Sequence, residues 1–363
     1  MKARNFNSLI RSIAKDQDII GLHPPLFIGN EKRFINETID SNYVSSVGKF
    51  VDKFEKSISS LTTSKYSIAT VNGTSALQIA LILGNVKLGD EVLTQALSFV
   101  ATSNAISYLK AKPVFIDVDI DTMGMSPLAL ESFLEEFGEK RETGTYNKLT
   151  GSKISACLPM HTFGFMCRID EIKKICLKWK INLIEDSAEA LGSQYKLKYS
   201  GTFGLLSAYS FNGNKIITSG GGGCITTQDE ELFKRAKHIT TTAKISANYE
   251  YIPDEVGYNF RMPNINAALA CAQLESFQDI IKNKKKLYEF YAEELPSIGI
   301  ELASIPKETT WNYWLIPIIL ETKKDRDLFL EQTNKDKILT RPIWRLLYNC
   351  LLYTSPSPRD RSI

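Results

Sequence analysis

The chain has 363 residues, which is enough for one large domain and a smaller one, each with its own core. Its net charge is only +3 and its basic residues are scattered, so nucleic acid is not an expected partner. Its six cysteines form no C-x-x-C pair, its three histidines do not cluster, and no apolar run reaches transmembrane length. We therefore expect no metal site and no membrane partner, and free thiols in a cytoplasmic protein.

The first 20 residues predict a short amphipathic helix rather than a signal peptide, because apolar positions are interrupted every few residues. From about residue 66 to residue 228, β-rich runs alternate with helical patterns. The expected strands are 66–71, 91–95, 113–118, 154–160, 181–186, 206–211 and 222–227. The expected helices are 74–86, opened by Thr74 or Ser75, a stretch from Phe99, 126–137 with Ser126 as N-cap, 168–179 and a helix from Asp229.

This alternation predicts an α/β domain with a largely parallel sheet, which binds ligands at the carboxyl ends of its strands. After residue 263 the pattern changes to a long helix, 263–295, broken once near Phe277. A strand over 312–320 and a helix over 324–335 follow, so we predict a smaller α+β domain. The expected division is an N-terminal arm 1–35, a large domain 36–262, a small domain 263–349 and a tail 350–363.

The tail "CLLYTSPSPRDRSI" is polar and proline-bearing, unlike an element that closes such a domain. Its first residues, "CLLYTSPSPRD" (350–360), match one reading frame of a transposase-type sequencing adapter residue for residue. We therefore expect residues 350–363 to be foreign to the protein and its natural C-terminus to be missing. The alternative is a disordered tail.

Lys215 lies in "SFNGNKIITSGGGG", between a polar turn and four consecutive glycines. A lysine next to buried apolar residues is a typical nucleophile towards an aldehyde, and the glycines favour a close approach of the backbone. The alternative is a surface lysine that precedes a glycine hairpin.

Two further motifs come before this lysine in the chain. Asp186 ends a strand in "NLIEDSAEALGS", where an acid is either a cofactor ligand or the cap of the following turn. "VNGTSAL" places a glycine and two hydroxyl residues at a helix start, an arrangement that suits a phosphate but also ordinary capping. Together, a phosphate cradle, a strand-end aspartate and a lysine form the working set of a pyridoxal phosphate (PLP) enzyme.

The sequence resembles the DegT/StrS-type sugar-nucleotide aminotransferases, which have the aspartate aminotransferase fold (type I PLP-dependent). The markers are "VSSVGKFVDKFE", "NGTSAL", "PMHTFG", "EDSAEALGS", "SFNGNK", "GGGG" and "EVGYNFRMPNINAALACAQLE". "LHPPLFIGNEK", "VSSVGKFVDKFE", "NYWL" and "TRPIW" resemble the branch of the legionaminic acid pathway, the LegC-like enzymes.

The resemblance implies a role for each matching position. It makes Lys215 the lysine that attaches to the cofactor aldehyde and Asp186 the partner of the pyridine nitrogen. It assigns the cofactor phosphate to Thr74, Ser75 and Ser210, the ring to Phe99, and the phenolic oxygen to Glu189. It also implies that Asn259 reaches the cofactor phosphate of a neighbouring subunit, and hence a homodimer with shared active sites.

Three positions stay open. Asn212 stands where many members have histidine, His161 fits a structural role better than a catalytic one, and Arg261 could bind an anion or a helix end.

The implied reaction transfers an amino group from L-glutamate to a 4-keto-6-deoxy hexose or hexosamine linked to UDP or GDP, for a nonulosonic acid or a related surface glycan. Two alternatives remain. A sugar dehydratase of this fold would have histidine in place of Lys215. A regulatory or binding protein of this fold would bind cofactor without transferring an amino group.

Overall fold

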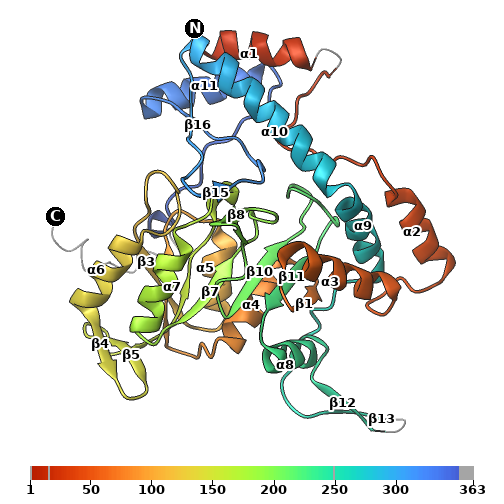
Figure 1. Ribbon diagram of the computed structural model, residues 1–363, viewed down its shortest axis with the longest axis vertical. Coiled ribbons are helices and arrows are strands. Elements are labelled where there is room, and N and C mark those ends of the chain that lie inside the picture. The colour runs from red at the N-terminus through yellow and green to blue at the C-terminus, as the bar shows by residue number, and fades with distance from the viewer. Residues whose placement is uncertain (1, 15–16, 248–249, 351–363) are drawn as a thin grey trace.

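The computed structural model describes residues 2–14, 17–247 and 250–350. Beyond Cys350, the tail that we expected to be foreign lies outside the described residues. The chain forms a sheet-bearing part and, above it in Figure 1, a part built from both ends of the described chain. In the described residues, no helix is both long and apolar enough to cross a membrane.

The sheet has nine strands within the described residues, seven of them along one path. In spatial order this path is β1 (Tyr66–Thr70), β11 (Gly223–Thr227), β10 (Leu206–Ser210), β7 (Asn182–Asp186), β6 (Lys153–Leu158), β2 (Glu91–Gln95) and β3 (Lys112–Ile116). The strands from β10 to β3 run parallel, and β11 runs antiparallel to both of its neighbours. This confirms the predicted, largely parallel sheet, whose carboxyl edge gathers the loops after β7 and β10.

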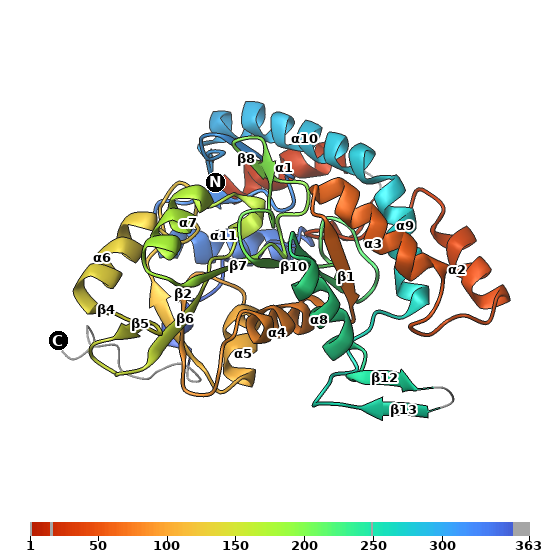
Figure 2. The same cartoon turned by 60° about the horizontal axis from the view of Figure 1, so that its bottom comes forward.

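Helices cover both faces of the sheet (Figure 2). On one face lie α4 (Gly73–Leu83), α5 (Val100–Tyr108) and α8 (Glu230–Thr240). On the other lie α6 (Pro127–Phe137), α7 (Ile169–Lys178), α3 (Lys49–Thr62) and α9 (Asn264–Glu275), and α9 also packs on α2 (Glu31–Asp40). Successive strand residues alternate between the faces: Ile68 packs with α4, and Ala69 with α3.

The predicted cap Ser126 is confirmed, because its side chain accepts a hydrogen bond from the backbone of α6. The helix expected from Asp229 begins at Glu230, and the Asp229 side chain caps it by accepting the amide of Leu232. The predicted start of α4 is wrong, because Asn72 is its cap and Gly73 is its first residue. The Asn72 side chain accepts a hydrogen bond from the amide of Ser75 at 2.8 Å, which satisfies one donor of the first turn. Thr74 is then the second residue of the helix, at its N-terminus.

The N-terminal helix packs against the C-terminal part of the chain. After α9, a break at Ser276 leads into α10 (Phe277–Glu294), as expected near Phe277. α1 (Lys2–Ile13), the predicted amphipathic helix, buries Phe6 and Ile10 against this C-terminal part. The other elements there are β14 (Glu301–Leu302), β16 (Ile318–Ile319), α11 (Lys323–Lys335) and the short helix η2 (Leu295–Ile298). The short helix η3 (Leu347–Asn349) lies instead next to the sheet, where the amide of Leu347 donates to the carbonyl of Ala96, just after β2. α2 spans the expected boundary between residues 35 and 36; the division into domains remains a prediction.

The predicted strand 312–320 is largely wrong. Only Ile318–Ile319 forms a strand there, β16, which pairs with β14. Tyr313 has a φ of +56°, which is outside the extended region, and Pro317 has no amide hydrogen for a ladder. Trp311 and Trp314 are both buried, so the apolar residues of this stretch pack in the core from an irregular segment and not from a strand.

Several small elements had no sequence prediction. They are the hairpin β4 (Gly138–Arg141) and β5 (Gly144–Asn147), the sheet of β8 (Gln194–Tyr195), β9 (Lys198–Tyr199) and β15 (Thr309–Thr310), the helix η1 (Thr162–Gly164), and the hairpin β12 (Lys244–Ala247) and β13 (Glu250–Pro253). The β12–β13 hairpin projects from the body of the molecule (Figures 1 and 2).

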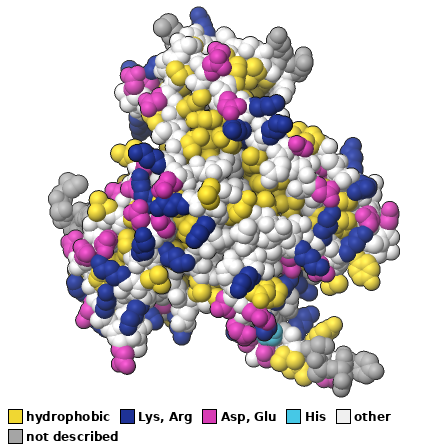
Figure 3. All heavy atoms as spheres, viewed as in Figure 1, with side chains coloured by type: hydrophobic (Ala, Val, Ile, Leu, Met, Phe, Trp, Pro, Cys, Tyr) yellow, Lys and Arg dark blue, Asp and Glu magenta, His cyan; other side chains and the backbone are white. Residues whose placement is uncertain are grey.

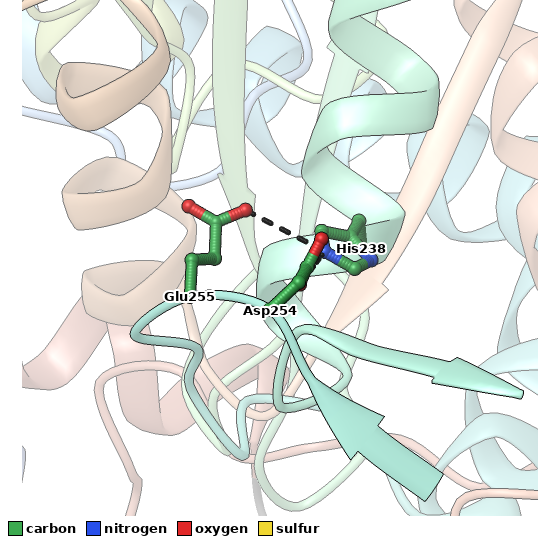
Figure 4. Close-up of side chains that lie close together, drawn as sticks. All are labelled: His238, Asp254 and Glu255. Atoms are coloured by element: carbon green, nitrogen blue, oxygen red, sulfur yellow. Dashed lines mark hydrogen bonds and ion pairs between the residues drawn. The ribbon is translucent and has the colours of Figure 1, made fainter.

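The base of this hairpin is held to α8 by three side chains (Figure 4). His238 Nε2 lies 2.7 Å from Asp254 Oδ1 and 3.5 Å from Glu255 Oε1. This grouping has metal-binding atom types, but both oxygens of Glu255 are already bonded to the guanidinium of Arg235. We therefore interpret the cluster as an anchor of the hairpin.

Candidate active site

A cavity of about 950 Å³ lies between the carboxyl edge of the sheet and the C-terminal part of the chain. Hydrophobic side chains gather on the face of the molecule where these two parts meet (Figure 3). The structure brings most of the predicted site residues to this cavity: its lining includes Thr74, Phe99, Asp186, Glu189, Ser210 and Lys215. Its far side is formed by residues of α10 and α11 and by the segments 314–323 and 338–344.

Lys215 enters the cavity from a turn that is anchored in the core. Its amide donates to the carbonyl of Asn212 at 3.0 Å, and the following Ile216 and Ile217 are buried. Its side chain is only 12% exposed, which rules out the surface-lysine alternative. Lys215 Nζ lies 3.3 Å from Glu189 Oε1 and 4.5 Å from the centroid of the Trp314 ring. A primary amine is thus held within the cavity by a carboxyl group and an aromatic face.

Asp186 is the last residue of β7 and is buried. Its Oδ2 accepts a hydrogen bond from the Thr102 hydroxyl at 2.7 Å, and its Oδ1 accepts the amide of Ala188 at 3.1 Å. The second bond is the turn contact that we had considered as an alternative role, so the residue makes this contact and also lines the cavity. Burial raises the pKa of this carboxyl, although these two hydrogen bonds and Lys215 oppose the shift. A cation next to Asp186 would offset the free-energy cost of burying its negative charge.

Glu189 joins the lysine to the loop after β6. Its Oε2 accepts the amide of Phe163 at 2.8 Å, while its Oε1 faces Lys215. Burial raises the pKa of Glu189 to about 7, against the opposing effect of Lys215. This carboxyl group is therefore able to hold or release a proton near neutral pH.

The helix start of α4 forms a small cradle with the end of β10. A Cβ on Gly73 would lie 2.8 Å from the Cβ of Ser210, so only glycine allows these two segments to come this close. In the glycine run, a Cβ on Gly223 would lie 2.3 Å from the carbonyl oxygen of Asn72, which explains that glycine in the same way. Thr74 and Ser210 line the cavity here, where the N-terminus of a helix favours a phosphate.

Ser75 does not share this position. It is buried, its amide is bonded to Asn72, and it is absent from the cavity lining. The structure thus brings Thr74 and Ser210 to the cradle, with Ser75 behind them.

Phe99 directly precedes α5, lines the cavity and is 49% exposed. Its ring centroid lies 6.3 Å from that of Trp344, which in turn lies 5.3 Å from that of Phe163. These rings give the cavity an aromatic wall on which a planar ring can stack.

The residues that we left open differ in position. Asn212 lines the cavity. His161 is fully buried and structural: its Nδ1 accepts the amide of Cys167 at 3.3 Å, and its Nε2 lies 3.1 Å from Glu185 Oε2. Asn259 is exposed and outside the cavity lining, where its Oδ1 accepts the side chain of Arg261 at 3.0 Å.

Sequence reasoning missed Thr102, Trp314 and Lys284. Thr102 follows Phe99 by three residues on α5, so helical spacing could have placed it at the same edge. Trp314 was assigned to a strand, and its true position depends on the positive φ of Tyr313, for which the sequence carries no signal. Lys284 reads as one of several lysines on a solvated helix.

These residues fit pyridoxal phosphate. The cradle offers a helix start and two hydroxyl groups, Phe99 offers an aromatic face, and Lys215 offers an amine that can reach an aldehyde. Asp186 offers a buried carboxylate that a protonated ring nitrogen would neutralise.

Comparisons with known proteins agree with this geometry. Residues 27–361 match the DegT/DnrJ/EryC1/StrS aminotransferase family. GDP-perosamine synthase of Escherichia coli O157:H7 is 34% identical over 92% of this chain and 87% of its own length. EpsN of Bacillus subtilis, named as a pyridoxal phosphate-dependent aminotransferase, is 36% identical over 92% of this chain and 84% of its own. PseC of Helicobacter pylori, an aminotransferase involved in the biosynthesis of pseudoaminic acid, superposes with a TM-score of 0.80 at 25% identity, covering 93% of this chain and 87% of PseC.

The chain has the type I fold of PLP-dependent aminotransferases, and the family relationship supplies the cofactor that the cavity fits. The protein therefore belongs to the DegT/DnrJ/EryC1/StrS family and is a pyridoxal phosphate-dependent aminotransferase.

Proposed function

We propose that this aminotransferase moves the amino group of L-glutamate to the 4-keto group of a nucleotide-linked 6-deoxy hexose or hexosamine. The observation that carries the proposal is the position of Lys215 Nζ, inside the cavity and 3.3 Å from Glu189, on the same wall as the buried Asp186. The relatives named GDP-perosamine synthase and the PseC structure support a sugar nucleotide as the acceptor.

The cofactor supplies an aldehyde that accepts the amino group and a ring that takes up electron density. The residues of the chain do the rest. Asp186, fixed by Thr102 and Ala188, would keep the ring nitrogen of a bound cofactor protonated. Lys215 Nζ would move a proton to and from the reacting carbon of the donor and C4 of the sugar. Glu189 accepts a hydrogen bond from Lys215 and would steady the amine between these positions.

For the acceptor we favour a 4-keto-6-deoxy-N-acetylhexosamine linked to UDP or GDP, on the path to a nonulosonic acid such as legionaminic acid or to a related surface glycan. The support is the resemblance of "LHPPLFIGNEK", "NYWL" and "TRPIW" to the LegC-like branch. Trp314 and Trp344, in the last two of these motifs, both line the cavity. The five buried free thiols are typical of a reducing compartment and support a cytoplasmic location.

We also propose a homodimer in which Asn259 reaches the cofactor phosphate of the partner subunit. Asn259 is exposed and lies next to the base of the β12–β13 hairpin, which carries the exposed apolar residues Ile245, Tyr251 and Ile252. Exposed apolar side chains gathered on a projecting hairpin favour an interface between copies of the chain.

The test is the visible absorption spectrum of the PLP-loaded protein before and after L-glutamate, alongside Lys215→Ala. We expect a lysine-dependent band in the wild type that glutamate bleaches, and a variant that lacks this band and loses amino transfer by roughly 10³-fold or more. The bleached protein is then mixed with UDP- and GDP-linked 4-keto sugars, and the band returns with the true acceptor.

A wild type that binds the cofactor but shows no lysine-dependent band and no response to glutamate would overturn the proposal in favour of a binding or regulatory protein. Light scattering on the same preparation gives the mass of the assembly, and a monomer would contradict the shared site.

A further inference from the structure

A lysine on the C-terminal side of the cavity has no partner in the part of the chain that the structure describes. Lys284 lies on α10 and lines the cavity together with Leu287 and Tyr291, which follow it at helical spacing on the same face. No hydrogen bond or ion pair joins the Lys284 ammonium to another described residue. Its neighbours Lys285 and Lys286 are exposed, so Lys284 is the lysine of this run that faces inward.

The other cations of this wall differ from Lys284. Arg326 is paired with Asp327, with its Nη2 at 2.6 Å from Oδ1, and the guanidinium of Arg341 lies 3.3 Å from the carbonyl oxygen of Thr340. Lys323 lies at the first position of α11 and is exposed. Lys284 is half-buried. It is therefore the cation of this wall that combines a partly covered side chain with the lack of a partner in the described chain.

Such a position is unfavourable for the folded protein by itself. Burial lowers the pKa of Lys284 to about 8. An unpaired ammonium in a half-buried position loses part of its hydration without gaining a partner, whereas cations in such positions are as a rule paired with an anion. An unpaired ammonium in a substrate cavity becomes favourable when an anionic ligand binds and pairs with it.

His23 gives a second unpaired polar group close by. Its Nδ1 is buried and without a hydrogen-bond partner in the described chain, and its ring lies 6.4 Å from the ring of Trp314. Burial, and then the charge of Lys284, lower the pKa of His23 to about 3. The ring therefore stays neutral and does not compete with Lys284 for an anion.

We propose that Lys284 binds an anionic oxygen group of a substrate, either a carboxylate of the amino donor or a phosphate of the sugar nucleotide. The proposal rests on the proposed function, because both sources are substrates of that reaction. The ammonium would form a charge-assisted hydrogen bond in a partly desolvated position, where such bonds are strong. Lys284 would thus select and position substrate, while Lys215 on the opposite wall acts on it.

The test measures the binding of two unreactive probes to the PLP-loaded protein by calorimetry. Glutarate carries the two carboxylates of glutamate without its amino group, and UDP carries a diphosphate without the sugar. The variant is Lys284→Met, and the control is Lys286→Met on the same helix, at an exposed position. We expect Lys284→Met to bind one of the probes about tenfold more weakly, or worse, and the control to bind both like the wild type.

The probe that Lys284→Met fails to bind shows which substrate supplies the anionic group. Loss of glutarate binding alone identifies a donor carboxylate, and loss of UDP binding alone identifies the nucleotide phosphates. Binding of both probes by Lys284→Met as tightly as by the wild type overturns the proposal, and so does a wild type that binds neither. Lys284→Arg keeps the charge and is expected to retain the binding that Lys284→Met loses.

Thermal unfolding separates this role from a structural one. Methionine fills the space of the lysine stem without a buried charge, so we expect the Tm of Lys284→Met to stay the same or rise. A lysine kept for packing would give a lower Tm and unchanged probe binding. The bleaching of the visible band by glutamate in the wild type is a separate readout, so failure of the proposed function and failure of this proposal remain distinguishable.

Discussion

The two walls of the cavity are built in different ways. The sheet wall, which we define as Thr74, Asp186, Glu189, Ser210 and Lys215, follows the ends of β7 and β10 and the start of α4. Its carboxyl groups are held by short-range contacts, such as the 3.1 Å bond from the Ala188 amide to Asp186. The helix wall, which we define as Lys284, Leu287, Tyr291, Trp314 and Ile316, brings together α10 and an irregular segment. Its one charged group in this set, Lys284, has no partner in the described chain.

This difference suggests that the sheet wall carries out the reaction and that the helix wall recognises the substrate. The acid and the amine of the sheet wall are fixed before substrate binds, which suits groups that must handle a proton at a defined atom. The helix wall offers apolar surface, an aromatic ring and a free cation, which suit the recognition of a large substrate. Substitutions on the sheet wall should therefore change kcat, and substitutions on the helix wall should change KM.

The largest effect in this comparison is expected for Asp186→Asn. The variant keeps the size of the side chain but removes the negative charge that we propose for the partner of the ring nitrogen, so we expect kcat to fall by roughly 10²- to 10³-fold with little change in the KM for either substrate. Steady-state kinetics with L-glutamate and the identified sugar nucleotide measures both constants.

Asp170→Asn is the matched control, because Asp170 lies on α7 and bonds to Lys196 at 2.9 Å outside the cavity. If Asp186→Asn raised KM and left kcat intact, the two walls would not divide the work as we describe.

A smaller effect is expected for the pH dependence of stability at Glu189. Its pKa in the folded protein is about 7, above the ordinary value of 4.5, because the group is buried. Between these values the unfolded chain releases this proton while the folded protein keeps it. The group's contribution is thus fully present below about pH 4.5 and is lost as pH rises to 7. In cofactor-free protein this amounts to roughly 3 kcal/mol in the free energy of unfolding.

Glu189→Gln removes this titration, and glutamine keeps a donor and an acceptor for its neighbours. Urea unfolding gives the free energy of unfolding at pH 5 and at pH 8. We expect this free energy to decrease from pH 5 to pH 8 in the wild type, and the decrease to be smaller by about this amount in the variant. Asp186 also has a raised pKa, and its charge contributes to the raised pKa of Glu189, so the variant keeps the part of the slope that belongs to Asp186 and loses the part that belongs to Glu189 and to its interaction with Asp186. Equal slopes in the two proteins would mean that Glu189 is already ionised at pH 5.

The same two walls show how far the sequence could be read. The sheet wall was predicted nearly whole, because each of its residues follows a strand or opens a helix with a local pattern, as Asp186 does after "NLIE". Ser75 was the exception: its amide is bonded to the cap residue Asn72, and its side chain is buried outside the cavity lining. The helix wall was not predicted. Lys284 looks like its exposed neighbours, and its burial results from the packing of α10 against segments far away in the chain.

The smallest effect concerns the close approach that shapes the sheet wall. A Cβ on Gly73 would lie 2.8 Å from the Cβ of Ser210, so Gly73→Ala must push α4 and β10 apart by a few tenths of an ångström. Alanine is a better helix former than glycine, so we expect the Tm to change little. The displacement should instead weaken the binding of pyridoxal phosphate about tenfold, which corresponds to about 1.4 kcal/mol.

Gly213→Ala is the matched control, because a Cβ there meets no atom of the described chain within 4 Å, although Gly213 lies only two residues from Lys215. Fluorescence titration of the cofactor-free proteins gives the Kd of each. A Gly73→Ala variant that binds the cofactor like Gly213→Ala would mean that the phosphate does not lie at the junction of α4 and β10. Thr74 and Ser210 would then be helix and strand ends without a ligand, and the functional part of the sheet wall would shrink to Asp186, Glu189 and Lys215.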